Sequence, residues 1–123
     1  MLKSNRVWEQ ELVLWEDRLR AVDAMRQLCD DWDGQAAQAP GEAVVSLTLA
    51  TLQELITNLY PAPTIVSAGV NGTIVCEWNM AESTIELEIE TDLRRECIII
   101  NKLSNTVTQL PMETLLRGEF DYD

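Results

Sequence analysis

The first part of the chain places hydrophobic residues with the period of an amphipathic helix. Apolar side chains recur at alternating steps of four and three, while acidic residues occupy the opposite side. We therefore predict one helix over about residues 4–31. At a rise of 1.5 Å per residue it would be about 40 Å long, which exceeds the width of a domain of this size. Two interpretations stay open for its apolar stripe: it packs on the domain's own sheet, or the end from Trp8 to Trp15 projects as a seam for self-association or a partner.

A second helical pattern follows a short charged break. The sequence Asp-Asp-Trp-Asp-Gly at 30–34 predicts the end of the first helix, with Gly34 available for a left-handed cap. Pro40 is tolerated in a first helical turn, and an apolar stripe with helical spacing runs from there to Pro61, which cannot continue a helix. We predict the second helix over about 41–60.

After Pro61 the hydrophobic period changes from 3.6 to two, which is typical of strands. Asn71-Gly72 predicts a hairpin turn, and Ser83–Thr91 alternates apolar residues with glutamates. Further strands are predicted at 96–102 and at 106–110, followed by one or two helical turns and a tail over 111–123. The predicted fold class is α+β. Two N-terminal helices, the first one long, pack on a four- to five-stranded antiparallel meander at about 63–110, within a single domain 1–123.

The pairing of strands 83–91 and 96–102 has two possible registers. A two-residue turn at Asp92-Leu93 would place Cys97 and Ile99 on the face that carries the glutamates, whereas a three-residue turn would place Ile98 and Ile100 there. Either register puts apolar side chains beside the glutamate row. The C-terminal segment could also cover this face through its apolar residues, which are Leu115, Leu116 and Phe120.

Charge narrows the function classes. The 123 residues contain 21 acidic and 9 basic side chains, which gives a net charge of −12 without any histidine. Non-specific binding to nucleic acid or to an anionic membrane needs basic patches, so we expect neither. Acidic residues interrupt any signal-peptide pattern and no apolar run is long enough to span a membrane, which predicts a cytoplasmic protein. The three widely spaced cysteines form no metal-binding motif and are predicted to be buried free thiols, with no cofactor.

Two acidic groups invite a catalytic or metal-binding interpretation. Asp30, Asp31 and Asp33 do not fit a calcium loop, because Gly34 at the sixth position would put Cys29 first and Pro40 twelfth. We expect Asp33 to bind local backbone N–H groups instead. Glutamates on one open strand face lack the closed cleft that acid–base chemistry requires, so we predict no enzyme activity and no metal site.

Residues 32–90 contain, in order, Trp32-Asp33-Gly34, a small-residue loop and helix, Pro63, and the segment Gly72-Thr73-Ile74-Val75-Cys76-Glu77-Trp78. In this pattern the chain resembles a family of small uncharacterised bacterial proteins. Asn71 stands where the family pattern has Asp. The resemblance implies the order of elements and a bacterial or phage origin, and it implies no catalytic residue.

These patterns predict a non-enzymatic, acidic protein-interaction module. It would serve as an inhibitor, antitoxin-like neutraliser or complex subunit in a bacterial or phage accessory system, with a basic protein as partner and a possible homodimer through the N-terminal helix. One alternative is a nucleic-acid mimic that blocks a DNA- or RNA-binding enzyme, and another is a small ligand-binding protein or enzyme. The predicted partner-binding residues are Trp8, Leu12, Trp15, Leu19, Glu86, Glu88 and Glu90.

Overall fold

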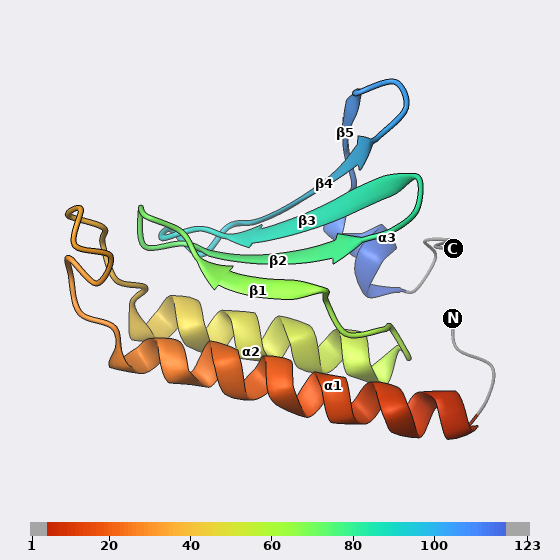
Figure 1. Ribbon diagram of the computed structural model, residues 1–123, viewed down its shortest axis with the longest axis horizontal. Helices are drawn as coiled ribbons and strands as arrows, with labels where there is room; N and C mark the ends of the chain where they lie inside the picture. The colour runs from red at the N-terminus through yellow and green to blue at the C-terminus, as the bar shows by residue number, and fades with distance from the viewer. Residues whose placement is uncertain (1–4, 118–123) are drawn as a thin grey trace.

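The computed structural model describes residues 5–117 and has the predicted α+β architecture. Two helices lie side by side against one face of a five-stranded antiparallel sheet whose strands follow chain order (Figure 1). The tail 118–123 and the first residue of the predicted 4–31 helix lie outside the described residues. The elements are α1 (Asn5–Ala24), the 3-10 helix η1 (Met25–Gln27), α2 (Glu42–Thr57), β1 (Ile65–Ala68), β2 (Ile74–Asn79), β3 (Ser83–Ile89), β4 (Arg95–Asn101), β5 (Val107–Gln109) and α3 (Met112–Leu116).

The first helix ends earlier than its hydrophobic pattern predicts. The chain becomes extended at Leu28 and enters a loop that is held by aspartate side chains. Asp33 Oδ1 accepts hydrogen bonds from the backbone N–H groups of Gln35 and Ala37 at 2.9 and 3.0 Å, as predicted for this residue. Asp31 Oδ1 likewise accepts a 2.7 Å hydrogen bond from the backbone N–H of Ala36. These backbone contacts give the aspartates a structural role and stop the helix before residue 31.

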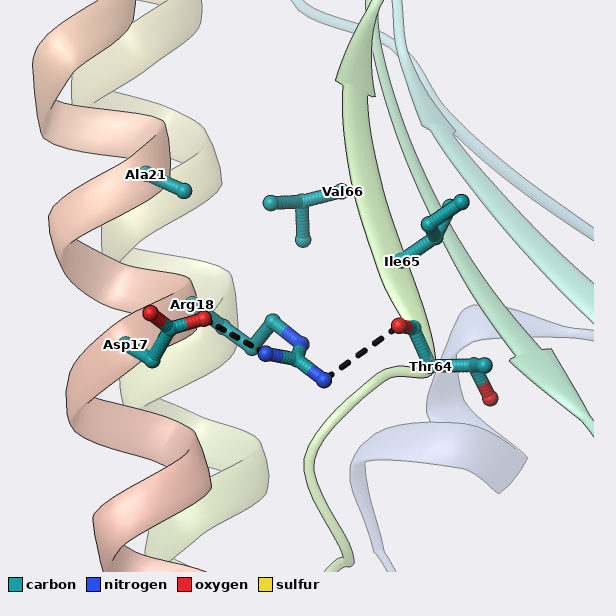
Figure 2. A pocket seen from close by; sticks show the side chains of 6 residues that line it. All are labelled: Asp17, Arg18, Ala21, Thr64, Ile65 and Val66. Carbon is teal, nitrogen blue, oxygen red and sulfur yellow. Dashed lines mark hydrogen bonds and ion pairs between the residues drawn. The ribbon is translucent and has the colours of Figure 1, made fainter.

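The strand β1 lies at the edge of the sheet beside α1. Arg18 reaches from α1 to the chain just before this strand (Figure 2). Its Nε donates a 2.7 Å hydrogen bond to the carbonyl of Pro63, and a second nitrogen donates one of 3.3 Å to the carbonyl of Thr64. Asp17 pairs with the same guanidinium at 2.6 Å. Arg18 therefore fixes the start of β1 against the first helix.

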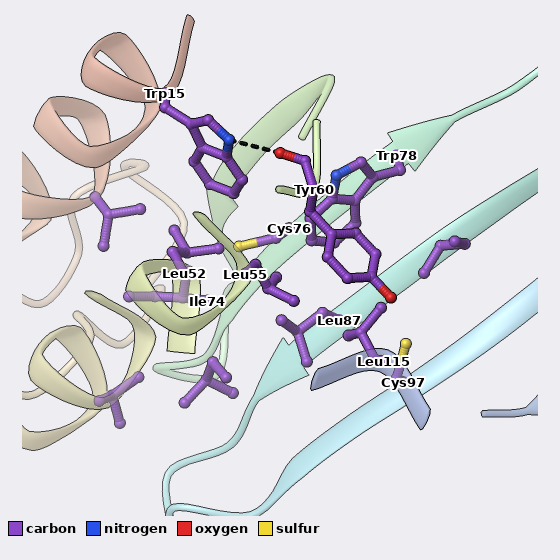
Figure 3. Packing of buried hydrophobic residues seen from close by; sticks show 14 of the residues in the cluster. Trp15, Leu52, Leu55, Tyr60, Ile74, Cys76, Trp78, Leu87, Cys97 and Leu115 are labelled. Carbon is purple, nitrogen blue, oxygen red and sulfur yellow. Dashed lines mark hydrogen bonds between the residues drawn. The ribbon is translucent and has the colours of Figure 1, made fainter. Parts of the chain in front are cut away.

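The core lies between the two long helices and the sheet (Figure 3). Trp15 is 1% exposed, and its indole N–H donates a 2.8 Å hydrogen bond to the carbonyl of Tyr60. The alternating residues of β2 and β3 that face the helices are buried, which confirms the period-two prediction. Leu115 of α3 packs into this core from the helix side, so α3 does not cover the opposite sheet face. Phe120, the other residue considered for that role, lies outside the described residues.

The cysteines follow the prediction only in part. Cys76 and Cys97 are buried on the core face of the sheet, and burial raises the pKa of each thiol to about 12. Cys29 is instead exposed, because it follows η1 at the point where the chain has left the helical packing against the core.

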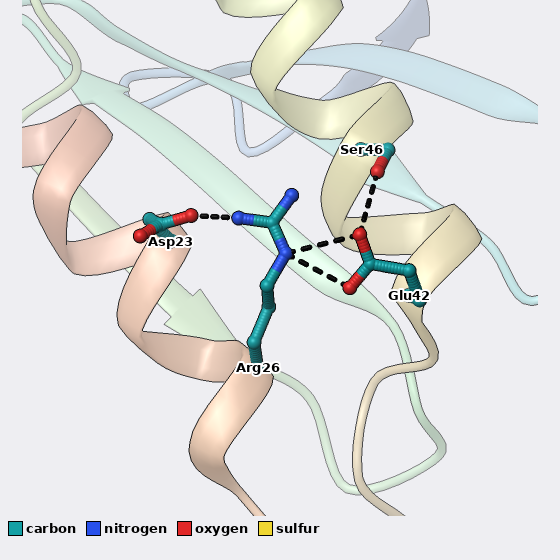
Figure 4. Close-up of polar contacts among 4 residues, drawn as sticks. All are labelled: Asp23, Arg26, Glu42 and Ser46. Carbon is teal, nitrogen blue, oxygen red and sulfur yellow. Dashed lines mark hydrogen bonds and ion pairs between the residues drawn. The ribbon is translucent and has the colours of Figure 1, made fainter.

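An ion-pair cluster joins the end of the first helical segment to the start of α2 (Figure 4). Arg26 interrupts the apolar stripe of the sequence, and its guanidinium pairs with Asp23 and with Glu42. The Arg26 Nε–Glu42 Oε2 distance is 2.8 Å, and Ser46 donates a hydrogen bond to the same carboxylate at 3.1 Å. The hydrogen bonds from Arg26 and then Ser46 hold the pKa of Glu42 below its ordinary value.

Two hairpins lie at the same end of the sheet, and each of them has a loop of three residues. Gly69 and Thr73 close the β1–β2 loop around Asn71-Gly72, and Glu90 and Arg94 close the β3–β4 loop. Gly72 has φ +80°, a conformation that favours glycine. A Cβ added at this position would lie 3.0 Å from the side-chain nitrogen of Gln38. The equivalent position of the second loop is Leu93, at φ 70°. The Asn-Gly hairpin prediction is confirmed, with a loop one residue wider than the shortest hairpin connection.

Candidate functional site

The sheet face that points away from the helices carries the predicted glutamates; we call it the open face. The register pairs Glu86 of β3 with Glu77 on one side and with Ile98 on the other. This is the register that a three-residue turn predicts, and it settles the alternative that the sequence left open. The side chains of the open face on β1–β5 are Ile65, Ser67, Val75, Glu77, Asn79, Thr84, Glu86, Glu88, Glu96, Ile98, Ile100, Val107 and Gln109.

Like charges lie directly opposite each other at the centre of this face. Glu77 pairs across strands with Glu86, and Glu88 pairs with Glu96. All four side chains are half-buried. Directly opposed Cβ atoms in an antiparallel pair are about 4.5–5.5 Å apart, so each pair of carboxylates repels and destabilises the sheet. With Glu90 they form what we call the acidic patch (Glu77, Glu86, Glu88, Glu90 and Glu96).

The environment of Glu86 disfavours its ionised form. Burial is the largest cause that raises the pKa of Glu86 above its ordinary value of 4.5. The charge of Glu77 and a hydrogen bond with it follow, and the charge of Glu88 adds a smaller effect. The acidic patch therefore stores unfavourable charge repulsion that a cationic partner would relieve.

One arginine of the chain lies at the edge of the acidic patch. Arg94 is 3.1 Å from Glu90 Oε2, 2.9 Å from Asp92 Oδ2 and 3.7 Å from Glu96 Oε1. Its surroundings, Asp92 first, raise the pKa of Arg94. Carboxylate oxygens of Glu88, Glu90 and Glu96 lie within 4.8 Å of one another, a spacing that a cation could bridge, and Arg94 already provides positive charge to two of them. The patch thus shows within the chain itself that a guanidinium fits between its carboxylates.

Apolar side chains border the acidic patch on the β4–β5 side. Ile98 and Ile100 are half-buried on the open face, and Val107 of β5 is 62% exposed. Beyond them, the β4–β5 loop presents Leu103 at 87% exposure. The Asn101 side chain accepts hydrogen bonds from the N–H groups of residues 103 and 104, both at 3.0 Å, which gives this loop a defined shape. The open face therefore combines a central group of carboxylates with an apolar border on a structured hairpin.

The structure separates the predicted helix residues from the predicted glutamates. Trp15 was expected on a partner-facing seam, and this prediction is wrong: its side chain fills the chain's own core and its N–H is bound there. Trp8 and Leu19 are half-buried and pack against the same core, while Leu12 is 37% exposed. The helix packs beside α2, so most of the stripe faces the domain itself and is unavailable to a partner.

Glu86, Glu88 and Glu90 do lie on the open face, with Glu90 just after the end of β3. The sequence did not assign Glu96, Val107 or Leu103 to this surface. Alternation within strand 96–102 would have identified Glu96 once the turn length was known.

Neither protein-family models, nor curated proteins, nor solved structures give a match to this chain. The resemblance of residues 32–90 to a family of small bacterial proteins therefore stays a prediction. Within residues 5–117, the helices are too short or too polar to cross a membrane.

Proposed function

We propose that this chain is a non-enzymatic protein-binding module whose open face takes a basic partner protein. The repulsion built into the acidic patch carries the proposal. Two glutamate pairs oppose each other directly on a half-buried surface, at a cost of about 0.2–1 kcal/mol for each pair by the usual size of cross-strand effects. A fold gains nothing from such pairs by itself, whereas lysine or arginine side chains of a partner would convert the repulsion into attraction.

The apolar border indicates what kind of partner fits. Protein interfaces place apolar contacts beside polar and charged ones, and apolar anchors in pockets contribute most of the affinity. Ile98, Ile100 and Leu103 would supply such contacts next to the carboxylates. A partner would thus carry an apolar pocket or patch that is rimmed by lysine and arginine. These apolar side chains favour such a protein surface over a groove shaped for a nucleic-acid backbone, which was the mimic alternative.

In a cell, such a module would act as an inhibitor, a neutraliser or a subunit of a larger complex. The long-range field of a chain with net charge −12 would accelerate association with a basic partner, and the association rate would fall as salt rises. Self-association through the N-terminal helix is not required by this proposal, because most of the stripe packs on the chain's own core.

A photo-crosslinking experiment tests the proposal. A photoreactive side chain is placed at Ile98 in one variant and at Val13, on the outer side of α1, in a control variant, since Val13 is 66% exposed and distant in sequence. Both are expressed in the native host. We expect one basic protein to crosslink at position 98 and not at position 13.

A charge-matched pair of variants completes this test. Glu86→Gln combined with Glu88→Gln should weaken capture of the crosslinked protein at least tenfold. Glu16→Gln combined with Glu54→Gln removes the same charge from exposed helix positions and should change capture little. Equal loss in both variants would mean that overall charge, rather than the open face, drives binding, and the proposal would be wrong.

A further inference from the structure

The edge strand β1 has backbone groups that point away from its only strand partner among the described residues. The N–H of Gly69 donates to the carbonyl of Thr73 at 2.9 Å, in continuation of the β1–β2 register. Hydrogen-bonded pairs alternate along an antiparallel ladder, so Ser67 also pairs toward β2. The alternate residues of β1, Val66 and Ala68, consequently direct their N–H and C=O groups outward. Such an edge is a template for a further strand.

A groove runs along this edge between β1 and α1 (Figure 2). The volume of the groove is about 230 Å³. This is smaller than a typical small-molecule site, which has a volume of about 300–1,000 Å³. Val66 points toward α1, where Ala21 leaves room because its side chain is a single methyl group. The groove thus has space for side chains of an extended peptide, and it lies beside the backbone groups that would bind the peptide's main chain.

The charges around the groove define the peptide that fits. Arg18 already binds the carbonyls of Pro63 and Thr64, so the free part of the edge is Val66–Ala68. Alternate side chains of an added strand would point to opposite faces of the sheet. One set would enter the groove beside Ala21 and Val66, which suits a small apolar residue.

The other set would lie on the open face beside Ile65, whose cross-strand neighbour is Glu77 of the acidic patch. Neighbouring strands are about 4.8 Å apart, so the flexible side chain of a lysine or arginine on the added strand can extend across Ile65 toward the Glu77 carboxylate.

We propose that β1 accepts an extended segment of a partner protein as a sixth strand, and that this segment alternates small apolar residues with lysine or arginine. The basic character of the segment rests on the function proposed above, while the strand addition rests on the edge and the groove. Main-chain hydrogen bonds would supply affinity, and the alternating side chains would supply specificity.

The probe for this proposal is a short synthetic peptide of alternating lysine and valine, added to the ¹⁵N-labelled full chain. We expect NMR shift changes that concentrate on the amides of β1 and on α1 around Ala21. The same peptide with N-methylated valines cannot donate main-chain hydrogen bonds and should bind at least tenfold more weakly. The same peptide with glutamate in place of lysine should not bind.

A substitution in the groove provides the matched test on the protein side. Ala21→Phe fills the groove from the exposed surface of α1 and should weaken peptide binding at least tenfold, while Ala50→Phe on the exposed side of α2 should not. Shift changes confined to the open face, or equal binding of the N-methylated peptide, would overturn the proposal. Concentration-dependent changes of the β1 amides without peptide would also overturn it, because a second copy would then occupy the edge.

The two proposals fail in different ways. If the peptide does not reach β1 but the open-face variants still lose their partner, strand addition is wrong and the open-face function stands. If the peptide binds at β1 but the partner is indifferent to Glu86→Gln and Glu88→Gln, the open-face function is wrong and the edge site stands.

Discussion

Removing one charge from the acidic patch, while keeping a polar side chain of the same shape on this half-buried surface, should make the protein more stable. In the variant Glu86→Gln the side chain keeps its shape and the introduced amide can donate to the Glu77 carboxylate. Cross-strand charge effects are about 0.2–1 kcal/mol, so we expect the free energy of unfolding to rise by that amount at pH 7. For a chain of this length, such a gain corresponds to an increase in melting temperature of about 1–4 °C.

The pH dependence of this gain follows from the raised pKa of Glu86. The native state binds the proton more tightly than the unfolded state, so stability falls as pH rises from the ordinary value of 4.5 through the higher folded value. At pH 7 the ionised side chain therefore destabilises the wild type, and Glu86→Gln removes this effect. Below about pH 4 both states are protonated, and the charge-dependent part of the difference between variant and wild type should vanish.

Thermal unfolding across a pH series measures this directly, with Glu54→Gln as the control. Glu54 is exposed on α2 and makes no ion pair among the residues that the structure describes, so its substitution should shift the melting temperature little at any pH. In high salt, where the screening length falls to about 3 Å, the gain from Glu86→Gln should shrink. A variant that is less stable than the wild type at pH 7, or one whose gain is equal at acidic pH, would refute the repulsion argument.

Four further measurements test the fold. Trp15→Ala should lower the free energy of unfolding by about 3–5 kcal/mol in chemical denaturation, because it removes a large core side chain. A loss below about 1 kcal/mol would contradict the burial of Trp15. Leu93→Gly should raise stability by up to about 1 kcal/mol, and Leu93→Val should lower it, because a branched side chain fits positive φ worst; the reverse order would contradict the turn. Asp33→Ala should lower the melting temperature at neutral pH. Since backbone N–H groups of residues 35 and 37 lower the pKa of Asp33, the difference should be lost as pH falls below its ordinary 3.8. In the native protein Cys29 should react with a thiol reagent while the other two cysteines react only after denaturation, and native reaction of all three would contradict their burial.

The sequence predicted the elements well where a periodic pattern met a turn signal, and poorly where side chains from distant segments decide. Alternation along Ser83–Thr91 located β3, since only one face of that strand meets the helices. The helical spacing of apolar residues continues in the sequence to Cys29, whereas α1 ends at Ala24. The loop hydrogen bonds of Asp33 and its neighbours compete for this stretch of chain, and a one-dimensional pattern does not contain them.

Only part of the candidate site could be predicted from the sequence, for a related reason. The alternation in the sequence predicts its glutamates on β3, but which residues of β4 lie opposite them depends on the register across the Glu90–Arg94 loop. That register places Leu93 in a left-handed conformation, which leucine rarely adopts, so residue preferences give no reason to choose the three-residue turn. Once the turn is known, Glu96 and Ile98 follow by counting.

The two proposed contact regions are joined by a single cross-strand pair. Ile65 belongs to the edge strand and lies opposite Glu77, which itself lies opposite Glu86. A partner strand added at β1 would therefore extend the open face sideways and bring its basic side chains toward the end of the acidic patch. Both contacts would relieve the same repulsion between Glu77 and Glu86, so the electrostatic gain of one contact should be smaller once the other has formed. A partner fragment that contains both the strand segment and the apolar patch should then lose less affinity in Glu77→Gln than the two separate fragments lose in sum, and a loss equal to that sum would show that the two contacts are independent.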